Sequence, residues 1–404
     1  MTSMLHTPSR RHLLGALTAA TLAPLSTLSF AGNGRQGPSN RFVLVLLRGG
    51  LDGLAAVPAV GDPDFAPARG ALANFGAVPL PLSGLFALHP NLGHLHAMYG
   101  RGEMAVLHAT GLPYRERSHF DAQQVLESGG TQPYQISTGW LARGLKSAGH
   151  KGMALTTAVP LVLRGAGEVD TWAPSAMPDP SADLVARLER LYAGDRALAD
   201  ALARAKGLRG DPDMAAAGND AAMMQGGPRV QVVALARKAG EFLSKPNGPQ
   251  AAVIEIGGWD SHANQTAAQG AVAGNLQSLD AALAALRDAL LEPAAQGAWQ
   301  RTVVVVATEF GREVAINGTL GTDHGSGGMA LVLGGAVKGG QVLGDWPGLA
   351  KKDRFEGRDL RITSDLRALF KTVLDQHLRV PTAALEREVL PGSAGLRMLD
   401  VLKG

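Results

Sequence analysis

Short runs of apolar residues recur along the chain, and segments with helical periodicity separate them. The first run, at residues 42–47, is continuously apolar, which is typical of a strand buried on both faces. Similar runs occupy residues 104–109, 251–256, 302–307 and 329–333. Strands that alternate with helices indicate a parallel sheet that is covered on both sides. We therefore predict an α/β fold with a mostly parallel central sheet and helices on both faces.

The segments between these runs carry apolar residues three and four positions apart, as amphipathic helices do. Helices are predicted at residues 91–99, 118–127, 184–205, 230–243, 264–291 and 364–378. The segment at 264–291 is the longest, and its apolar face, which we expect to pack on the sheet, consists of Leu276, Leu279, Leu283, Leu286 and Leu290. In residues 163–227, clusters of Pro, Asp and Gly surround the helical pattern, so this region is predicted to be a cap or insertion over the sheet.

The N-terminus has the pattern of an export signal. Arg10 and Arg11 precede a mildly apolar stretch that ends in Ser29-Phe30-Ala31, a small-x-small cleavage site. The alternative is an uncleaved membrane anchor, but Pro24 and several hydroxyl side chains weaken this stretch as the span of about 20 apolar residues that a bilayer needs.

We therefore predict a twin-arginine signal peptide at residues 1–31, a linker at 32–40 and the α/β domain at 41–404. The protein is expected to pass through the twin-arginine translocase, to keep no stable membrane span after cleavage, and to be periplasmic or secreted.

Composition narrows the classes of function. Of the 404 residues, 46% are hydrophobic and 18% are charged, which suffices for a large core and argues against disorder. Clusters of Lys and Arg with interleaved aromatic residues are absent, so no nucleic-acid partner is expected. The chain has no cysteine, which excludes disulfides, thiolate zinc sites and a cysteine nucleophile.

Polar side chains that could bind a ligand stand directly after the apolar runs. Asp52 follows the first run, Asp260 and His262 the third, and Glu309 the fourth, while Asp323 and His324 precede the fifth. Because the carboxyl ends of parallel strands share one edge of a sheet, we expect these residues to converge there. Carboxylates mixed with imidazoles are ligands for zinc or manganese. A single Asp after a strand is more often a turn or helix-cap residue, and a single His is usually a satisfied surface or core group, so the prediction depends on their repetition.

A nucleophile is expected near these residues. Ser118 opens a predicted helix, where the positive end of the helix dipole favours a reactive hydroxyl or a bound anion. Plain N-capping is the alternative role for Ser118. The neighbouring His119 is a second catalytic candidate. Guanidinium groups that could clamp anionic oxygens, or that could pair with surface carboxylates instead, belong to Arg115, Arg117 and Arg312.

Six motifs in the chain resemble those of the exported proteins of domain of unknown function 1501, a family assigned to the alkaline-phosphatase-like superfamily. The resemblance covers residues 41 to about 378. Its motifs are Leu47-Arg48-Gly49-Gly50-Leu51-Asp52-Gly53-Leu54, Arg117-Ser118-His119-Phe120-Asp121, Gly139-Trp140-Leu141-Ala142-Arg143, Gly258-Trp259-Asp260-Ser261-His262, Thr308-Glu309-Phe310-Gly311-Arg312 and Thr322-Asp323-His324-Gly325. The resemblance implies an alkaline-phosphatase-like fold.

The superfamily pattern implies a metal site with one or two ions. One ion would be held by Asp260, His262 and His324, and a second by Asp52, Ser118 and Glu309. Phe310 stands where the superfamily has a histidine after the fourth strand, which departs from the pattern at the second ion. A rival mapping takes Asp323 and His324 as the superfamily's Asp-His doublet.

The resemblance also implies a function, namely metal-dependent hydrolysis of small anionic phosphate or sulfate esters with Ser118 as the nucleophile. The ion would be zinc, or manganese, magnesium or calcium. With a single ion, hydrolysis by water at the ion is the simpler course. The alternative is a non-catalytic exported binding or assembly protein on the same fold, which holds a structural ion or an anionic ligand. A third interpretation, a structural secreted protein, predicts no bound ion.

Overall fold

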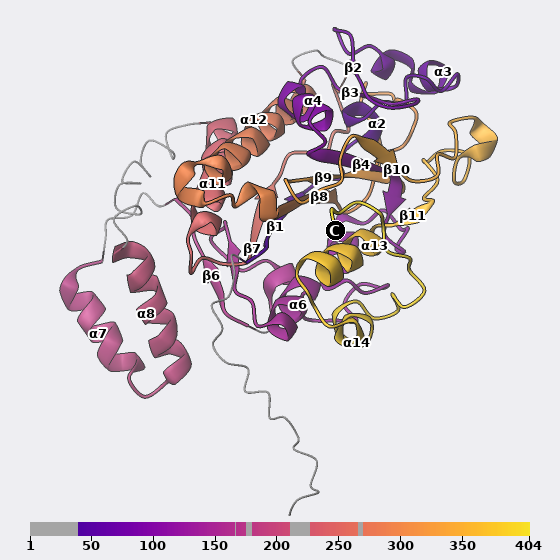
Figure 1. Ribbon diagram of the computed structural model, residues 1–404. Coiled ribbons are helices and arrows are strands. Elements are labelled where there is room, and N and C mark those ends of the chain that lie inside the picture. Colours follow the sequence, from indigo (N-terminus) through magenta and orange to yellow (C-terminus); the bar gives the residue numbers. More distant parts are fainter. Residues whose placement is uncertain (1–38, 166, 175–179, 211–226, 266–269) are drawn as a thin grey trace, which may run out of the picture. The chain divides into compact units, whose positions relative to one another are not determined.

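Four long parallel strands and one antiparallel strand form the centre of the computed structural model. The structure describes residues 39–165, 167–174, 180–210, 227–265 and 270–404. The predicted signal peptide and almost all of the predicted linker lie outside the described residues, and the description below concerns residues 40–404, which form one compact unit. Figure 1 shows the sheet crossing the middle of this unit, with helices on both sides.

The central strands coincide with the five predicted apolar runs. They are β1 (Arg41–Leu47), β4 (Met104–Gly111), β7 (Ala251–Ile256), β8 (Thr302–Thr308) and β9 (Gly328–Leu333), and all are buried almost throughout. β1 pairs in parallel with both β7 and β8. β9 lies between β8 and β4 and is antiparallel to both. The segment between β8 and β9 contains no helix, and antiparallel neighbours need no helical crossover.

Short strands extend this sheet in the order β10-β4-β9-β8-β1-β7-β5-β6. They are β5 (Gly152–Ala154), β6 (Val169–Thr171) and β10 (Gln341–Leu343), and β11 (Ser364–Asp365) pairs with the end of β4. The sequence analysis did not predict them, because two or three residues are too few to form an apolar pattern. The mostly parallel sheet with helices on both faces is confirmed.

Each face of the sheet is covered by its own set of helices. Alternate residues of β1 point to opposite sides, so Val43 and Val45 belong to one core and Phe42 and Leu44 to the other. The first core includes α4 (Gly93–Gly100), α11 (Pro228–Ser244) and α12 (Ala271–Leu291). The second includes α5 (His119–Ser128), α6 (Trp140–Ala148) and α13 (Leu366–Thr372). The five predicted leucines of α12 are all buried in the first core, and Figure 1 shows α12 beside α11.

Three predicted helices have different bounds in the structure. Residues 184–205 belong to two helices, α7 (Ala182–Tyr192) and α8 (Arg196–Gly210), because the side chain of Asp195 accepts hydrogen bonds from Ala197 N and Leu198 N and caps a new helix. α12 begins only at Ala271. In the segment predicted at 364–378, the first two residues form β11 and Asp365 caps α13.

The region predicted to be a cap, residues 163–227, contributes β6 to the central sheet, and α7 has no buried residue. Residues 166, 175–179 and 211–226 lie outside the described residues, and the cap remains a prediction. Among the helices that the structure describes, none combines the length and the apolar character that crossing a membrane requires.

Candidate metal centre

Four side chains from distant parts of the chain meet at the edge of the sheet where β1, β7 and β8 end. Asp260 and His262 follow β7, and His324 stands in the segment that leads into β9. His119 is the first residue of α5, which comes after β4. The structure therefore brings together three of the predicted metal ligands, Asp260, His262 and His324, and adds His119, which the sequence indicated only as a catalytic candidate.

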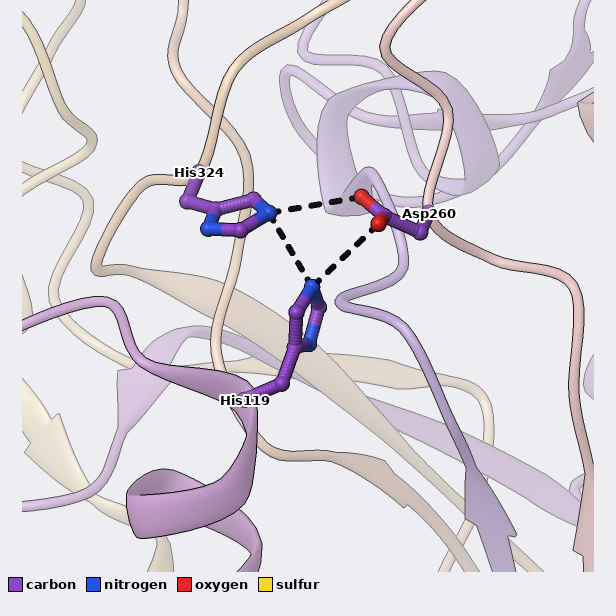
Figure 2. Close-up of side chains that lie close together, drawn as sticks. All are labelled: His119, Asp260 and His324. Carbon is purple, nitrogen blue, oxygen red and sulfur yellow. Dashed lines mark hydrogen bonds and ion pairs between the residues drawn. The ribbon is translucent and has the colours of Figure 1, made fainter.

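The imidazole Nε2 atoms of the three histidines face one another across this edge. His324 Nε2 lies 3.0 Å from His119 Nε2 and 2.9 Å from His262 Nε2. The Asp260 carboxylate closes the group: its Oδ1 lies 3.0 Å from His262 Nε2 and 3.3 Å from His324 Nε2, and its Oδ2 lies 3.5 Å from His119 Nε2. Figure 2 shows His119, His324 and Asp260 pointing toward one another. We call these four side chains the Nε2 group.

The opposite nitrogen of each ring, Nδ1, contacts an atom that can only accept a hydrogen bond. His119 Nδ1 lies 2.8 Å from Glu309 Oε1, His262 Nδ1 lies 3.0 Å from Asp323 Oδ1, and His324 Nδ1 lies 2.9 Å from the Arg117 carbonyl oxygen. Each Nδ1 must therefore carry the hydrogen, and in a neutral ring this leaves a lone pair on Nε2. The lone pair of His324 then faces those of the other two rings and a carboxylate, an arrangement that is repulsive unless a proton or a metal ion lies between the donors.

The charges around the group favour ionised carboxylates. Burial raises the pKa of Glu309, but the hydrogen bond from His119 and further donors outweigh burial and hold this pKa below its ordinary value. Hydrogen bonds from Asn317 and His262 lower the pKa of Asp323. The hydrogen bond to Glu309 raises the pKa of His119, whereas burial lowers the pKa of His324. The two rings thus differ in their affinity for a proton although their Nε2 atoms are neighbours.

Arg312 holds Asp260 from the protein interior. Its side chain is fully buried, and Nη1 donates to Asp260 Oδ1 at 2.7 Å. The rest of the guanidinium is bound by Thr322, whose carbonyl oxygen accepts from Nη2 and whose hydroxyl accepts from Nε. Burial raises the pKa of Asp260, but the hydrogen bond and charge of Arg312 outweigh burial and lower it. Arg312, predicted as a catalytic clamp for anionic oxygens, thus lies behind the carboxylate and orients it.

Glycines allow the loop after β1 to approach this group. A Cβ on Gly49 would lie 2.6 Å from the backbone nitrogen of Asp260, and one on Gly50 would lie 2.7 Å from the ring of Phe310. Both glycines have a positive φ, which side chains rarely tolerate. The Gly49-Gly50 pair therefore lets the end of β1 pack directly against Asp260 and Phe310.

Asp52 lies at the same edge but outside the Nε2 group. Its Oδ1 accepts hydrogen bonds from Leu54 N and Ala55 N and so caps the short helix α2 (Gly53–Ala56). Its Oδ2 accepts from Arg69 Nη2 and from Gln265 Nε2, both at 2.5 Å. Protein donors thus use both oxygens of Asp52, the predicted first ligand of a second ion.

Three further predicted ligands lie next to members of the Nε2 group without belonging to it, namely Glu309, Asp323 and Ser118. Glu309 Oε1 accepts from Gly49 N, His119 Nδ1 and Gln123 Nε2, and its Oε2 accepts from the Thr308 hydroxyl. Asp323 contacts His262 through Nδ1, on the far side of the ring from Nε2. Ser118 is the N-cap residue of α5 without a side-chain capping bond, and its hydroxyl interacts with Tyr114. The structure places these three predicted ligands around the group and not in it.

Phe310 contacts the site through its ring. Its centroid lies 4.7 Å from that of His119 and 5.0 Å from that of His324. The imidazole that the superfamily pattern expects at Phe310 is thus missing, but His119 supplies an imidazole from α5 instead. The sequence signal for His119 as a donor was its place at the start of a helix that follows a buried strand.

Comparison with known structures gives several distant likenesses. The chain is similar to Ps i-CgsB, solved in complex with k-i-k-neocarrahexaose (10% identity, 90% of this chain and 75% of that chain, TM-score 0.43). It is also similar to the PsFucS1 sulfatase from Pseudoalteromonas sp. (13% identity, 91% and 72%, TM-score 0.42). A third is the phosphonate monoester hydrolase of Agrobacterium radiobacter (12% identity, 85% and 74%, TM-score 0.40).

Among curated proteins, none matches the sequence of this chain. The sequence profile of one family does match, over residues 51–389, and that span contains the whole Nε2 group together with Asp52, Ser118, Glu309 and Asp323. The chain therefore belongs to the family DUF1501, described as a protein of unknown function.

Proposed function

We propose that this protein is an exported, metal-dependent hydrolase of phosphate or sulfate esters. The observation that carries the proposal is the convergence of three Nε2 lone pairs on the Asp260 carboxylate, with each Nδ1 hydrogen committed to an acceptor. A bound cation relieves the repulsion between the lone pairs, and a histidine whose second nitrogen donates to a carboxylate or carbonyl is the usual form of a metal-ligating histidine.

The donor set fits a zinc ion. Imidazole nitrogens and a carboxylate oxygen are zinc ligands, whereas magnesium and calcium prefer oxygen ligands alone. Around a tetrahedral zinc ion the donor atoms lie about 3.3 Å apart, since each stands about 2.0 Å from the ion. The distances of His324 Nε2 from its three neighbours and of His262 Nε2 from Asp260 Oδ1, 2.9 to 3.3 Å, agree with this spacing. His119, Asp260 and His324 form the set whose donor atoms all lie within 4.8 Å of one another, so His262 is the outermost of the proposed ligands.

A single ion per chain is favoured over two. The oxygens of Asp52 are taken by Arg69, Gln265 and the backbone of α2, and those of Glu309 by four protein donors. The guanidinium of Arg69 also carries the positive charge that a second ion would bring to Asp52. Ligands of the second predicted ion would therefore have to give up these bonds first.

An ion held by the Nε2 group supplies a Lewis acid for the oxygens of a phosphate or sulfate ester. The chain supplies the other parts. Arg312 and the Nδ1 partners keep the donors oriented, and Ser118 is the proposed nucleophile. Its position supports this role, because it precedes His119, stands at the positive end of α5 and makes no capping bond that would restrain its hydroxyl. The substrate is expected to be a small anionic ester.

Export through the twin-arginine translocase, and hence a periplasmic or secreted location, is part of the proposal. It is supported by Arg10 and Arg11 ahead of the apolar stretch and by the cleavage pattern that ends at Ala31. The route carries folded proteins, which suits a chain that acquires an ion before it is exported.

A non-catalytic exported protein that holds an ion is the second candidate. The observation that favours it is the full use of Asp52 and Glu309 by protein donors, which leaves a site with few free groups for chemistry.

One experiment separates the two candidates. The chain without residues 1–31 is loaded with Zn²⁺ and tested on aryl phosphate, aryl phosphodiester and aryl sulfate substrates, beside Ser118→Ala. For the enzyme we expect turnover by the unchanged protein, and loss of turnover with the ion retained in Ser118→Ala. Turnover that survives in Ser118→Ala would assign the attack to water. A tightly bound ion without turnover of any substrate would support the binding protein.

A further inference from the structure

We infer that Asp359, acting through Arg117, is a positioning residue that fixes the ring of His324 in the Nε2 group. The inference rests on the proposed binding of an ion by this group. Asp359 lies 35 residues beyond His324 in the chain and was not predicted as a site residue. Its carboxylate contacts Arg117, Ser326 and Arg358, which place it behind the Nε2 group.

The Asp359 carboxylate is fully buried and tied to charged and polar partners. Its Oδ2 accepts from Arg117 Nε at 2.9 Å and from the Ser326 hydroxyl at 2.8 Å, and Arg117 Nη2 lies 2.8 Å away. Burying a carboxylate is costly unless cations and hydrogen-bond donors surround it. The position of the Arg117 side chain is therefore strongly determined by Asp359.

The backbone of Arg117 is what contacts His324. Arg117 has a φ of +58°, a left-handed conformation that is unfavourable for a residue with a side chain. In this conformation its carbonyl oxygen accepts the hydrogen bond from His324 Nδ1 at 2.9 Å. The side-chain bonds of Arg117 to Asp359 and to Glu356 anchor the residue in this unfavourable conformation. The carbonyl in turn fixes the tautomer and the orientation of the His324 ring.

The segment that carries His324 is held by the same cluster on its other side. Arg358 Nη2 donates to the His324 carbonyl oxygen at 2.9 Å, and Arg358 Nε lies 3.4 Å from Asp359 Oδ1. The hydroxyl of Ser326, two residues after His324, donates to Asp359 Oδ2. Asp359 is thus the common partner of three groups that restrain the ring and backbone of His324, namely Arg117, Ser326 and Arg358.

This arrangement predicts that substitutions in the Asp359 cluster weaken ion binding more than a comparable substitution far from the Nε2 group does. Removing the charge in Asp359→Asn, or the anchor in Arg117→Ala, should loosen His324 without removing a donor. Outer partners of a metal-ligating histidine typically contribute 10- to 100-fold in metal affinity, and we expect about tenfold for these two variants. The side chain of Arg117 is 21% exposed and keeps Glu356 as a partner, so Asp359→Asn is expected to fold even where Arg117→Ala, which leaves the buried Asp359 carboxylate without its main cation, does not.

Glu103→Gln is the matched control. Glu103 is a carboxylate with two arginine partners, Arg287 and Arg101, but it precedes β4 at the opposite edge of the sheet. It therefore reports the cost of losing a comparable charged cluster far from the Nε2 group.

The test measures Zn²⁺ affinity by calorimetry and the visible absorption of the Co²⁺-loaded protein, which depends on ligand geometry, together with thermal unfolding of the ion-free proteins. We expect about tenfold weaker Zn²⁺ binding and an altered Co²⁺ spectrum in Asp359→Asn and Arg117→Ala, and unchanged values in Glu103→Gln. Unchanged affinity and spectrum in folded Asp359→Asn would overturn the inference and leave the proposed function standing. Failure of the unchanged protein to bind either ion would overturn both.

Discussion

Asp52 and Asp260 both follow a buried parallel strand at the same edge of the sheet, yet they end in opposite environments. Asp52 is 2% exposed, and protein donors use both of its oxygens. The side chain of Asp260 is 45% exposed and faces three imidazoles with lone pairs directed at it. The position of a carboxylate after a strand thus indicates the edge on which it lies, but not whether its oxygens remain available to a ligand.

The two carboxylates differ in availability because an arginine side chain approaches each of them from a different side. Arg69, the last residue of α3 (Phe65–Arg69), is completely buried and ends on Asp52 while also donating to the Val314 carbonyl oxygen. Arg312 donates to only one oxygen of Asp260, from behind, and is itself held by Thr322. Asp52 is therefore part of the framework, whereas Asp260 keeps a free side toward the histidines.

The largest effect is expected from His324→Ala. His324 Nε2 lies within 3.3 Å of His119, His262 and Asp260, so its loss removes the donor that contacts all other members of the group. Because outer partners alone contribute up to about 100-fold in affinity, Zn²⁺ binding should weaken by more than about 100-fold. His94→Ala is the control, since this exposed histidine pairs with Asp280 outside the site. Equal affinities of the two variants would contradict the assignment.

Exchanging the two aspartates for asparagine tests the comparison itself. Asp52→Asn leaves Arg69 buried without a carboxylate, which should cost about 3 kcal/mol of unfolding free energy but change Zn²⁺ affinity little. Asp260→Asn also leaves a buried guanidinium, that of Arg312, without its carboxylate, but this carboxylate is half exposed in the ion-free protein and is a ligand in the loaded one. Its loss of unfolding free energy should therefore be smaller than that of Asp52→Asn, and its loss of Zn²⁺ affinity larger. Denaturant unfolding and calorimetry check both halves. If Asp52→Asn weakened ion binding as much as Asp260→Asn does, Asp52 would belong to the site.

Glu309→Gln should have an intermediate effect. The substitution keeps the size of the side chain but removes the charge that faces His119 Nδ1, so Zn²⁺ affinity should fall by about tenfold. Glu255→Gln provides the control. Glu255 lies on β7 and pairs with Arg48, and no contact joins it to a histidine of the group. An affinity equal to that of the unchanged protein would mean that Glu309 does not act through His119.

The smallest effect concerns pH. The pKa of His119 is raised by its hydrogen bond to Glu309, so a proton competes with the ion for Nε2 at a higher pH than at an ordinary histidine. Zn²⁺ affinity should therefore decrease as pH falls from 7.5 to 6.5, by at most about tenfold for one displaced proton. In Glu309→Gln the protonated ring loses its partner, so the decrease should begin at a lower pH. Titrations at several pH values that show no such displacement would contradict the assigned hydrogen bond.

Much of the fold was predictable because its long strands and helices leave local patterns of apolar residues in the sequence. Continuous apolar runs identified β1, β4, β7, β8 and β9, and the spacing of leucines identified the buried face of α12. The direction of β9 was not predictable from its own residues, because it depends on the connection that precedes it. The short strands were too brief to leave a pattern.

The candidate site was predicted in part for a similar reason. That Asp260 and His262 lie at this edge follows from their place after a buried parallel strand, which the pattern indicates. His324 lies there because β9 is antiparallel, so that the residues before it start from the same edge. Which donor reaches which acceptor depends on loop geometry and on residues such as Arg69 and Asp359, whose positions no local pattern encodes. The place of His119 beside Phe310 and Glu309 was not predictable for the same reason, since α5 and the end of β8 meet only in the folded chain.

The most direct test of the central claim is the ion content of the chain without residues 1–31, measured by elemental analysis and by Zn²⁺ calorimetry on the ion-free protein. We expect one ion per chain, lost in His324→Ala and bound more weakly in Asp260→Asn. A protein that is folded but binds no divalent ion, or that binds one equally well without His324, would contradict this claim.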